Sequence, residues 1–228
     1  MIRWSLIDQA AMPGDGGDLR LMQRGSEYSI MSGAIELMNS RLSGSEKALA
    51  TLACERLKDR SGAHLLIGGF GMGFTLRAAL HALGPQARIT LGELVPAILA
   101  WARGPMAHMT GDCLDDPRLT LREGDVGDLI RTARGEFDAI LLDVDNGPEG
   151  LSRKANDRLY DAEGLLAARN ALRPGGVLAV WSAAPDASFT RRLGKAGFAV
   201  EEVRARASAA GKGARYIIWL ATAPSSKT

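Results

Sequence analysis

From residue 63 onward, short runs of apolar residues alternate with segments in which apolar residues recur at helical spacing. The runs have the length of strands and are apolar almost throughout, which is typical of strands buried on both faces of a parallel sheet. Five such strands are predicted, over 63–67, 88–93, 118–122, 137–142 and 176–181. This alternation predicts an α/β fold with helices on both faces of the sheet.

The end of the chain departs from this alternation. Two apolar runs, 198–203 and 216–220, are separated only by a loop rich in glycine, alanine and lysine, which predicts an antiparallel pair. The complete sheet is therefore predicted to be doubly wound, mostly parallel and seven-stranded. Residues 173–176 read Arg-Pro-Gly-Gly and predict a turn between a helix and the fifth strand.

The first part of the chain has a different pattern. Glycine-rich turns separate four short apolar runs, at 4–7, 19–22, 28–31 and 35–38. Ser32-Gly33 is a suitable hairpin turn, so residues 1–45 are predicted to form a small β-hairpin appendage. A helix over 46–57 is then expected to open the larger α/β domain, residues 46–228.

Composition narrows the class of protein. The chain has 228 residues, of which 46% are hydrophobic and 24% charged, as in a globular protein with a sizeable core. Its net charge of +2 is small and its basic residues are scattered, so no nucleic-acid partner is expected. No apolar run approaches a membrane span, the start lacks a signal-peptide pattern, and Cys54 and Cys113 are isolated. These features predict a cytoplasmic protein.

A knot of glycines follows the first predicted strand and precedes a helix-like segment, 75–81. Glycines at 69, 71 and 73 give the pattern G-x-G-x-G, which allows a nucleotide-like ligand to approach bare backbone. The dinucleotide fingerprint G-x-G-x-x-G would need glycine where Phe74 stands, and no Gly-Lys-Ser/Thr of a P-loop follows. A tight turn without a ligand remains the alternative.

Carboxylates stand near the ends of the next three predicted strands. Glu93 lies about 20 residues past the glycines, where an acidic residue accepts hydrogen bonds from ribose hydroxyls. Asp125 follows the third strand, and Asp143 and Asp145 follow the fourth, at the edge where open α/β sheets bind ligands. Each of these residues has a structural alternative, since Glu93 or Asp125 could cap a helix and the other two could stabilise a turn. Two neighbouring carboxylates also suit a general base, because their repulsion raises one pKa.

This arrangement resembles the class I S-adenosylmethionine-dependent methyltransferases over roughly residues 46–222. More narrowly, it resembles the spermidine synthases, including their small N-terminal β appendage. The matching motifs are Ile67-Gly68-Gly69 followed by Thr75-Leu76-Arg77, the strand Phe137 to Asp143, Leu159-Tyr160, and Leu172 to Gly176.

The resemblance implies where an S-adenosylmethionine-type donor would lie. Glu93 would bind the ribose hydroxyls, and Asp125 would accept a hydrogen bond from the adenine amino group. The backbone of the glycine turn would pack against the nucleoside and amino-acid tail, at Gly69, Gly71, Met72 and Gly73. Asp143 falls on the carboxylate that helps to deprotonate and orient the attacking amine in spermidine synthases. The histidines have no ligand spacing, so no metal is expected.

Departures from the family shape the expected reaction. Met72 stands where spermidine synthases have an aspartate that pairs with the free ammonium of decarboxylated S-adenosylmethionine, and a thioether cannot replace it. Arg41 places positive charge near the approach of a polyamine, and Trp181 replaces an expected polar residue. Together these departures favour methyl transfer from S-adenosylmethionine to a small-molecule acceptor, with Asp143 and Asp145 as catalytic candidates.

Two alternatives stay open. One is aminopropyl transfer from decarboxylated S-adenosylmethionine, in which Asp143 or Asp145 supplies the missing carboxylate. The other is a non-catalytic nucleoside-binding module or the partner subunit of an active enzyme. Tyr160 and Trp181 are expected to be core aromatics. Analogy with related enzymes also suggests a homodimer formed through the N-terminal region.

Overall fold

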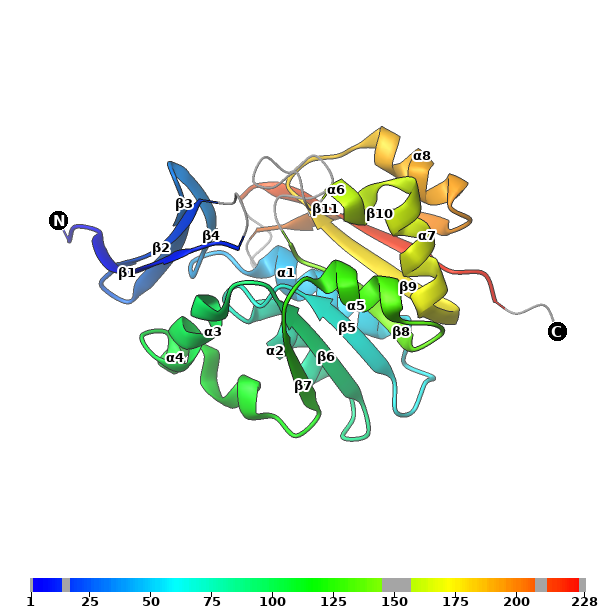
Figure 1. Ribbon diagram of the computed structural model, residues 1–228, viewed down its shortest axis with the longest axis horizontal. Coiled ribbons are helices and arrows are strands. Elements are labelled where there is room, and N and C mark those ends of the chain that lie inside the picture. The colour runs from blue at the N-terminus through cyan, green and yellow to red at the C-terminus, as the bar shows by residue number, and fades with distance from the viewer. Residues whose placement is uncertain (1, 14–16, 145–156, 208–212, 226–228) are drawn as a thin grey trace.

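The computed structural model describes residues 2–13, 17–144, 157–207 and 213–225 (Figure 1). Within these ranges the strands are β1 (Ser5–Ala11), β2 (Asp18–Arg24), β3 (Glu27–Ser32), β4 (Ile35–Asn39), β5 (His64–Gly68), β6 (Arg88–Glu93), β7 (Leu119–Glu123), β8 (Phe137–Leu142), β9 (Leu172–Ser182), β10 (Ala199–Arg206) and β11 (Arg215–Thr222). The helices are α1 (Gly44–Glu55), α2 (Phe74–Ala82), α3 (Pro96–Arg103), α4 (Ala107–Thr110), α5 (Val126–Thr132), α6 (Asp157–Tyr160), α7 (Ala162–Ala171) and α8 (Ala187–Lys195), with a 3-10 turn η1 at Gly111–Asp115. None of the described helices is both long and apolar enough to cross a bilayer.

The larger sheet has the predicted seven strands, in the order β10-β11-β9-β8-β5-β6-β7. The pairs from β9 to β7 are parallel, and β11 runs antiparallel to both of its neighbours, β9 and β10. The predicted doubly wound fold with a closing antiparallel pair is therefore confirmed. In this topology the carboxyl ends of β5, β6, β7 and β8 meet at one edge, and the glycine turn and the predicted carboxylates follow these ends.

One predicted boundary is wrong. The turn expected at residues 173–176 lies inside β9, which starts at Leu172 rather than at 176. Leu172 pairs with Phe137 and Val177 pairs with Ala139, so the four residues between them bulge out of the ladder. Gly175 has φ 68 within this bulge, a conformation that glycine adopts without strain. The Pro-Gly signal is thus real, but it marks an irregularity and not the end of a strand.

Both faces of this sheet are buried, as the apolar strands predict. Leu65 and Ile67 of β5 point into a core shared with α1, α2 and α3, while Leu66 points into a second core with α5, α7 and α8. The alternation follows from the two-residue period of a strand. Because both cores are closed by helices, the sheet opens to ligands only at its edges and ends.

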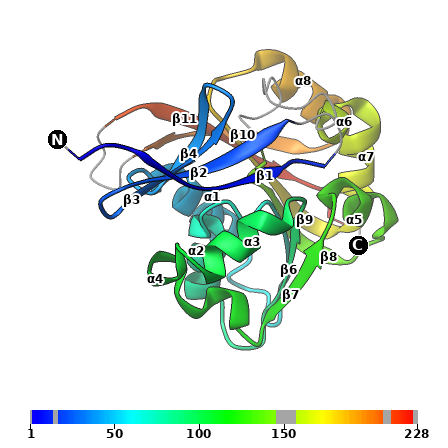
Figure 2. The ribbon, with the colours of Figure 1, turned by 60° about the vertical axis from the view of Figure 1, so that its left-hand side comes forward.

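The N-terminal appendage is a four-stranded antiparallel sheet in the order β1-β2-β3-β4, with Gly33 at φ 55 in the turn after β3. It packs beside α3 and the carboxyl end of the larger sheet (Figure 2). The Trp101 indole N–H donates to Asp8 Oδ2 at 2.7 Å, and the Tyr28 hydroxyl donates to the Pro105 carbonyl at 2.8 Å. The small sheet is therefore fastened to the larger one at a fixed position.

Candidate active site

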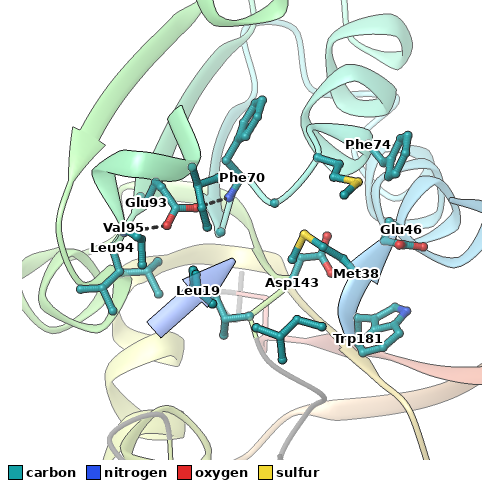
Figure 3. A pocket seen from close by; sticks show the side chains of 18 of the residues that line it. Leu19, Met38, Glu46, Phe70, Phe74, Glu93, Leu94, Val95, Asp143 and Trp181 are labelled. Atoms are coloured by element: carbon teal, nitrogen blue, oxygen red, sulfur yellow. Dashed lines mark hydrogen bonds between the residues drawn. The ribbon is translucent and has the colours of Figure 1, made fainter. Parts of the chain in front are cut away.

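A cavity of about 400 Å³ lies where the carboxyl ends of the parallel strands face the N-terminal sheet. Its walls come from β2, β4, the start of α1, the glycine turn, the ends of β6, β8 and β9, and β11. Figure 3 shows Glu93 on one side of this cavity and Met38, Asp143, Glu46 and Trp181 gathered on the other. The cavity therefore has two differently built halves.

The glycine turn forms the wall between these halves. Gly69 has φ +85, and a Cβ on it would lie 2.7 Å from the carbonyl oxygen of Asp143. A Cβ on Gly71, at φ +56, would lie 2.8 Å from the Met38 sulfur inside the cavity. Both positions favour glycine. The backbone that follows β8 lies against Gly69, the Met38 side chain lies against Gly71, and both residues have positive φ. Met72 is buried and also lines the cavity.

Gly73 has a different role from the other two glycines. It does not line the cavity, and a Cβ on it would lie 2.9 Å from the Phe70 ring. With φ 74 it is the N-cap residue of α2. Gly73 therefore shapes the start of α2 and is not among the residues that line the cavity, so its predicted contact with a donor stays a prediction.

Glu93 is buried at the end of β6 and faces the glycine turn. Its Oε2 accepts the backbone N–H of Phe70 at 2.8 Å, and its Oε1 accepts that of Val95 at 2.8 Å. Burial raises the pKa of this carboxyl, and the backbone hydrogen bonds act in the opposite direction. The contact with Val95 shows that Glu93 does stabilise the start of α3, as the structural alternative held. Glu93 thus lines the cavity while the backbone around it, including that of Leu94 and Gly71, interacts with its carboxylate.

Asp125 is the N-cap residue of α5, and its Oδ1 accepts the backbone N–H of Gly127 at 2.7 Å. It also lines the cavity, on the same side as Glu93 and Val126. The capping alternative is therefore present in the structure, and among the described residues no hydrogen-bond partner is found for the second carboxylate oxygen.

Asp143 follows β8 directly and lines the other half of the cavity. Thr75, buried in the first turn of α2, donates to Asp143 Oδ2 at 2.5 Å. Burial, followed by the nearby charge of Glu46, raises the pKa of Asp143 to about 7. A carboxyl with that pKa exchanges its proton near neutrality, as a general base must.

Sequence reasoning missed several residues of this half, among them Glu46 in α1, Glu36 in β4 and Tyr216 in β11. Trp181, predicted as a core aromatic, lines the cavity instead, and its ring lies 5.0 Å from that of Tyr216. These residues come from elements distant in sequence, so no local pattern joins them. The only local signal is an acidic residue, Glu46, at the start of a predicted helix.

The structure thus gathers most of the predicted site residues around one cavity: Gly69, Gly71, Met72, Glu93, Asp125 and Asp143. Asp145 lies outside the described residues. Tyr160 is buried in the core below α7 and α8, as expected, edge-on to Phe189 at 5.7 Å. Within the described part of the chain, no cluster of three or more potential metal-ligating side chains is found.

Residues 46–189 match the family model described as "Spermine/spermidine synthase domain". The chain belongs to this family. The match covers the segment from α1 through the start of α8, which carries the glycine turn and every carboxylate predicted from the sequence. The resemblance stated from the motifs is therefore confirmed.

Two curated members of the spermine/spermidine synthase family show the range of names among its relatives. "Polyamine aminopropyltransferase 1" of Streptomyces coelicolor is 33% identical over 152 residues, 62% of this chain and 28% of that protein. "Putrescine N-methyltransferase 2" of Nicotiana attenuata is 32% identical over 115 residues, 50% of this chain and 29% of that protein. The chain thus spans less than a third of the length of these two relatives. Most of the curated relatives carry the aminopropyltransferase name.

The fold is also similar to that of solved spermidine synthases. The crystal structure of spermidine synthase from Thermotoga maritima superimposes with a TM-score of 0.75, covering 95% of this chain and 72% of that chain at 18% identity. At this identity the likeness concerns the fold, including the small N-terminal sheet.

Proposed function

We propose that this chain transfers the aminopropyl group of decarboxylated S-adenosylmethionine to the nitrogen of a small amine. The observation that carries this proposal is the charge of the cavity. Five carboxyl side chains line it, those of Glu36, Glu46, Glu93, Asp125 and Asp143. No lysine, arginine or histidine is found among its described lining residues.

This charge distribution separates the two donors. S-adenosylmethionine carries a carboxylate besides its ammonium and sulfonium groups, and a cavity lined by carboxyls offers that carboxylate no cation. The decarboxylated donor carries only the two cations. A low-dielectric cavity lined by one sign of charge favours the more cationic ligand. The names of most curated relatives agree with this donor, so aminopropyl transfer replaces the methyl transfer favoured from the sequence.

The half of the cavity around Glu93 suits the nucleoside. Glu93 would accept the ribose hydroxyls and Asp125 the adenine amino group, while Gly69 and Gly71 leave the turn open to close contact. Apolar side chains of the N-terminal sheet, including Leu19 and Met38, complete the enclosure. This arrangement would exclude water from the reacting groups.

The other half suits the chemistry. The sulfonium donor supplies an electrophilic carbon and a neutral leaving group, so the protein mainly aligns the reactants and removes a proton. Asp143 stands at the end of β8, beside the turn that would hold the donor. With a pKa of about 7 it can accept the proton of an amine at neutral pH.

Calorimetry with the two donors tests the proposal. Decarboxylated S-adenosylmethionine is expected to bind at least about tenfold more tightly than S-adenosylmethionine, a difference of about 1.4 kcal/mol. Incubation with small amines should then give products heavier by one aminopropyl group, detected by mass spectrometry. Tighter binding of S-adenosylmethionine together with a methylated amine would overturn the proposal.

Methyl transfer is the second candidate, and Met72 is the observation that favours it. A buried thioether lines the cavity in the glycine turn, where it can pack against the donor tail but cannot pair with an ammonium. One relative is named as an N-methyltransferase. Replacing Met72 with Asp separates the candidates, because the new carboxylate should tighten binding of the decarboxylated donor and weaken binding of S-adenosylmethionine.

A further inference from the structure

The hydroxyl of Thr75 lies between two oxygen acceptors. Thr75 is buried in the first turn of α2. Its Oγ1 donates to Asp143 Oδ2 at 2.5 Å and also lies 3.3 Å from the main-chain carbonyl oxygen of Glu46, in the first turn of α1. A hydroxyl has one proton to donate. The Thr75 proton therefore has two positions open to it, one on a side chain that lines the cavity and one on the backbone of α1.

The two distances indicate which acceptor holds this proton when Asp143 is ionised. A separation of 2.5 Å is typical of a hydroxyl that donates to a charged oxygen, whereas 3.3 Å is long for a hydroxyl and a neutral carbonyl. The carboxylate is therefore the preferred partner. Burial, and then the charge of Glu46, raise the pKa of Asp143, and the hydrogen bond from Thr75 acts in the opposite direction.

The main chain holds the rest of Asp143. Its backbone N–H donates to the Gly68 carbonyl oxygen at 3.1 Å, and its own carbonyl oxygen lies against Gly69. These contacts fix the backbone of Asp143 against the end of β5, so only the side-chain torsions are left to set. The bond from Thr75 sets them, and Asp143 lines the cavity in the resulting orientation.

We propose that Thr75 is a positioning residue, whose hydroxyl orients the carboxylate of Asp143 and turns to the Glu46 carbonyl when Asp143 gains a proton. This inference rests on the proposed function, in which Asp143 accepts the proton of the amine. In that step one N–H bond of the ammonium breaks, its electron pair stays on nitrogen, and an O–H bond forms on Asp143. Thr75 keeps its own proton, and only the torsion about its C–O bond changes.

The second acceptor allows the site to satisfy both charge states of Asp143. Protonation removes the charge that makes the bond from Thr75 strong, and a proton on Oδ2 would itself need an acceptor. Once the Thr75 hydroxyl turns to the Glu46 carbonyl, its oxygen can accept from the protonated carboxyl. A carbonyl oxygen has two lone pairs, so that of Glu46 can accept from a helix amide and from Thr75 together. No buried donor is then left without a partner among these three groups.

The charged and titratable groups around Asp143 come from several elements. Glu46 in α1 acts on Asp143 directly. Burial raises the pKa of Glu46 as well, and Lys47 beside it acts in the opposite direction. Further titratable groups line the cavity, namely Glu36 in β4, Glu93 at the end of β6, Asp125 before α5 and Tyr216 in β11. A substitution of Thr75 alters none of these groups, so a changed titration of Asp143 reports the hydroxyl.

The test compares three variants. Thr75→Val removes the hydroxyl and keeps the shape of the side chain, and Thr75→Ser keeps the hydroxyl. Thr110→Val is the matched control, because Thr110 is also buried and donates to a main-chain carbonyl, that of Ala102 at 2.8 Å, but does not line the cavity. Putrescine serves as the acceptor probe, with decarboxylated S-adenosylmethionine as the saturating donor.

Thr75→Val is expected to move the acid limb of kcat/KM by about one pH unit toward higher pH, because the carboxylate loses a hydrogen bond that stabilises its charge. Its donor affinity should stay within about twofold of the wild-type value. Thr75→Ser should follow the wild-type pH profile, and Thr110→Val should lose stability without moving the acid limb. An unmoved acid limb in Thr75→Val, with product still formed, would overturn the inference, and so would an equal shift in Thr110→Val.

Carbon-13 NMR of labelled protein follows the same hydrogen bonds without catalysis. The Asp143 carboxyl should titrate with a midpoint of about 7 in the wild type and at higher pH in Thr75→Val. The main-chain carbonyl of Glu46 should shift with the midpoint of Asp143 in the wild type, because it gains the Thr75 proton there. A Glu46 carbonyl that does not follow Asp143 contradicts the inference, and this measurement needs no variant to fold.

Failure of the proposed function gives a different result. The wild-type protein would then neither bind the donor nor form product, whatever stands at position 75. The two titrations can still be recorded in that case, and identical Asp143 midpoints in the wild type and Thr75→Val would show that the hydroxyl does not set the state of this carboxyl.

Discussion

Glu93 uses both carboxylate oxygens to connect the glycine turn with the start of α3. Under the proposed function, the same side chain would also bind the ribose. Its removal should therefore weaken the donor site in two ways, by loss of the proposed ribose contact and by release of the Phe70 backbone.

We predict that Glu93→Ala lowers donor affinity by about tenfold to a hundredfold, the usual cost of losing charge-assisted hydrogen bonds. Calorimetry with decarboxylated S-adenosylmethionine measures this change, and circular dichroism checks that the variant is folded. Unchanged affinity would show that the ribose assignment is wrong.

The raised pKa of Asp143 gives a second prediction at the scale of single residues. Burial raises the folded-state pKa of this carboxyl to about 7, above its ordinary value, so its contribution to stability is greatest at low pH and is lost as pH rises through about 7. Asp143→Asn removes this penalty and should raise the free energy of unfolding at pH 8 by about 1 kcal/mol or more. Urea denaturation of both proteins at pH 5 and pH 8 tests this expectation.

The same substitution should abolish most of the catalysis, because the asparagine amide cannot accept the amine proton. A variant that is more stable at pH 8 but inactive would fit a carboxylate kept for function at a cost to stability. Equal stability of the two proteins at pH 8 would contradict the raised pKa. The two readouts are independent, so each can fail alone.

At the scale of the element, the glycine turn depends on the close approach of β5 and β8. We predict that Gly69→Ala lowers the free energy of unfolding by at least about 2 kcal/mol, because its Cβ would meet the Asp143 carbonyl at 2.7 Å with φ at +85. Gly84→Ala is the matched control, since no atom lies within 4 Å of its added Cβ. Urea denaturation should separate the two variants clearly.

The elements also show how much of the structure can be predicted from the sequence. The apolar runs predict the parallel strands, because burial on both faces of the sheet leaves a continuous run of apolar residues in the sequence. The start of β9 could not be read, since the bulge at Gly175 has the same Pro-Gly signature as a true turn. Glu46, Tyr216 and Trp181 were missed as site residues for another reason. Their meeting depends on how α1, β11 and β9 pack, which only the tertiary structure specifies.

At the scale of the whole molecule, the N-terminal sheet closes the cavity and must stay docked. We predict that Tyr28→Phe lowers the free energy of unfolding by about 1 kcal/mol, because the buried Tyr28 side chain loses its hydrogen bond to the Pro105 carbonyl. It should also weaken donor binding, since Leu19 and Met38 of the same sheet line the cavity. Limited proteolysis of the first 40 residues, with and without donor, measures the docking.

If Tyr28→Phe left both the proteolysis rate and the donor affinity unchanged, the small sheet would be held by its apolar contacts alone. Leu21 in β2 and Ile30 in β3 are fully buried side chains of this sheet and would then be the residues to replace. The result therefore distinguishes polar from apolar fastening of the same element.

The backbone link between the two halves has a consequence for how such proteins diversify. The amide of Gly69 donates to Gly92 and that of Asp143 donates to Gly68, so main chain alone sets the spacing between the nucleoside side and the base. The side chains around Glu46 belong to segments outside this ladder. Substitutions there leave this main-chain spacing unchanged, so under the proposed function they would alter the acceptor without moving the donor, and curated relatives do bear the names of two different reactions.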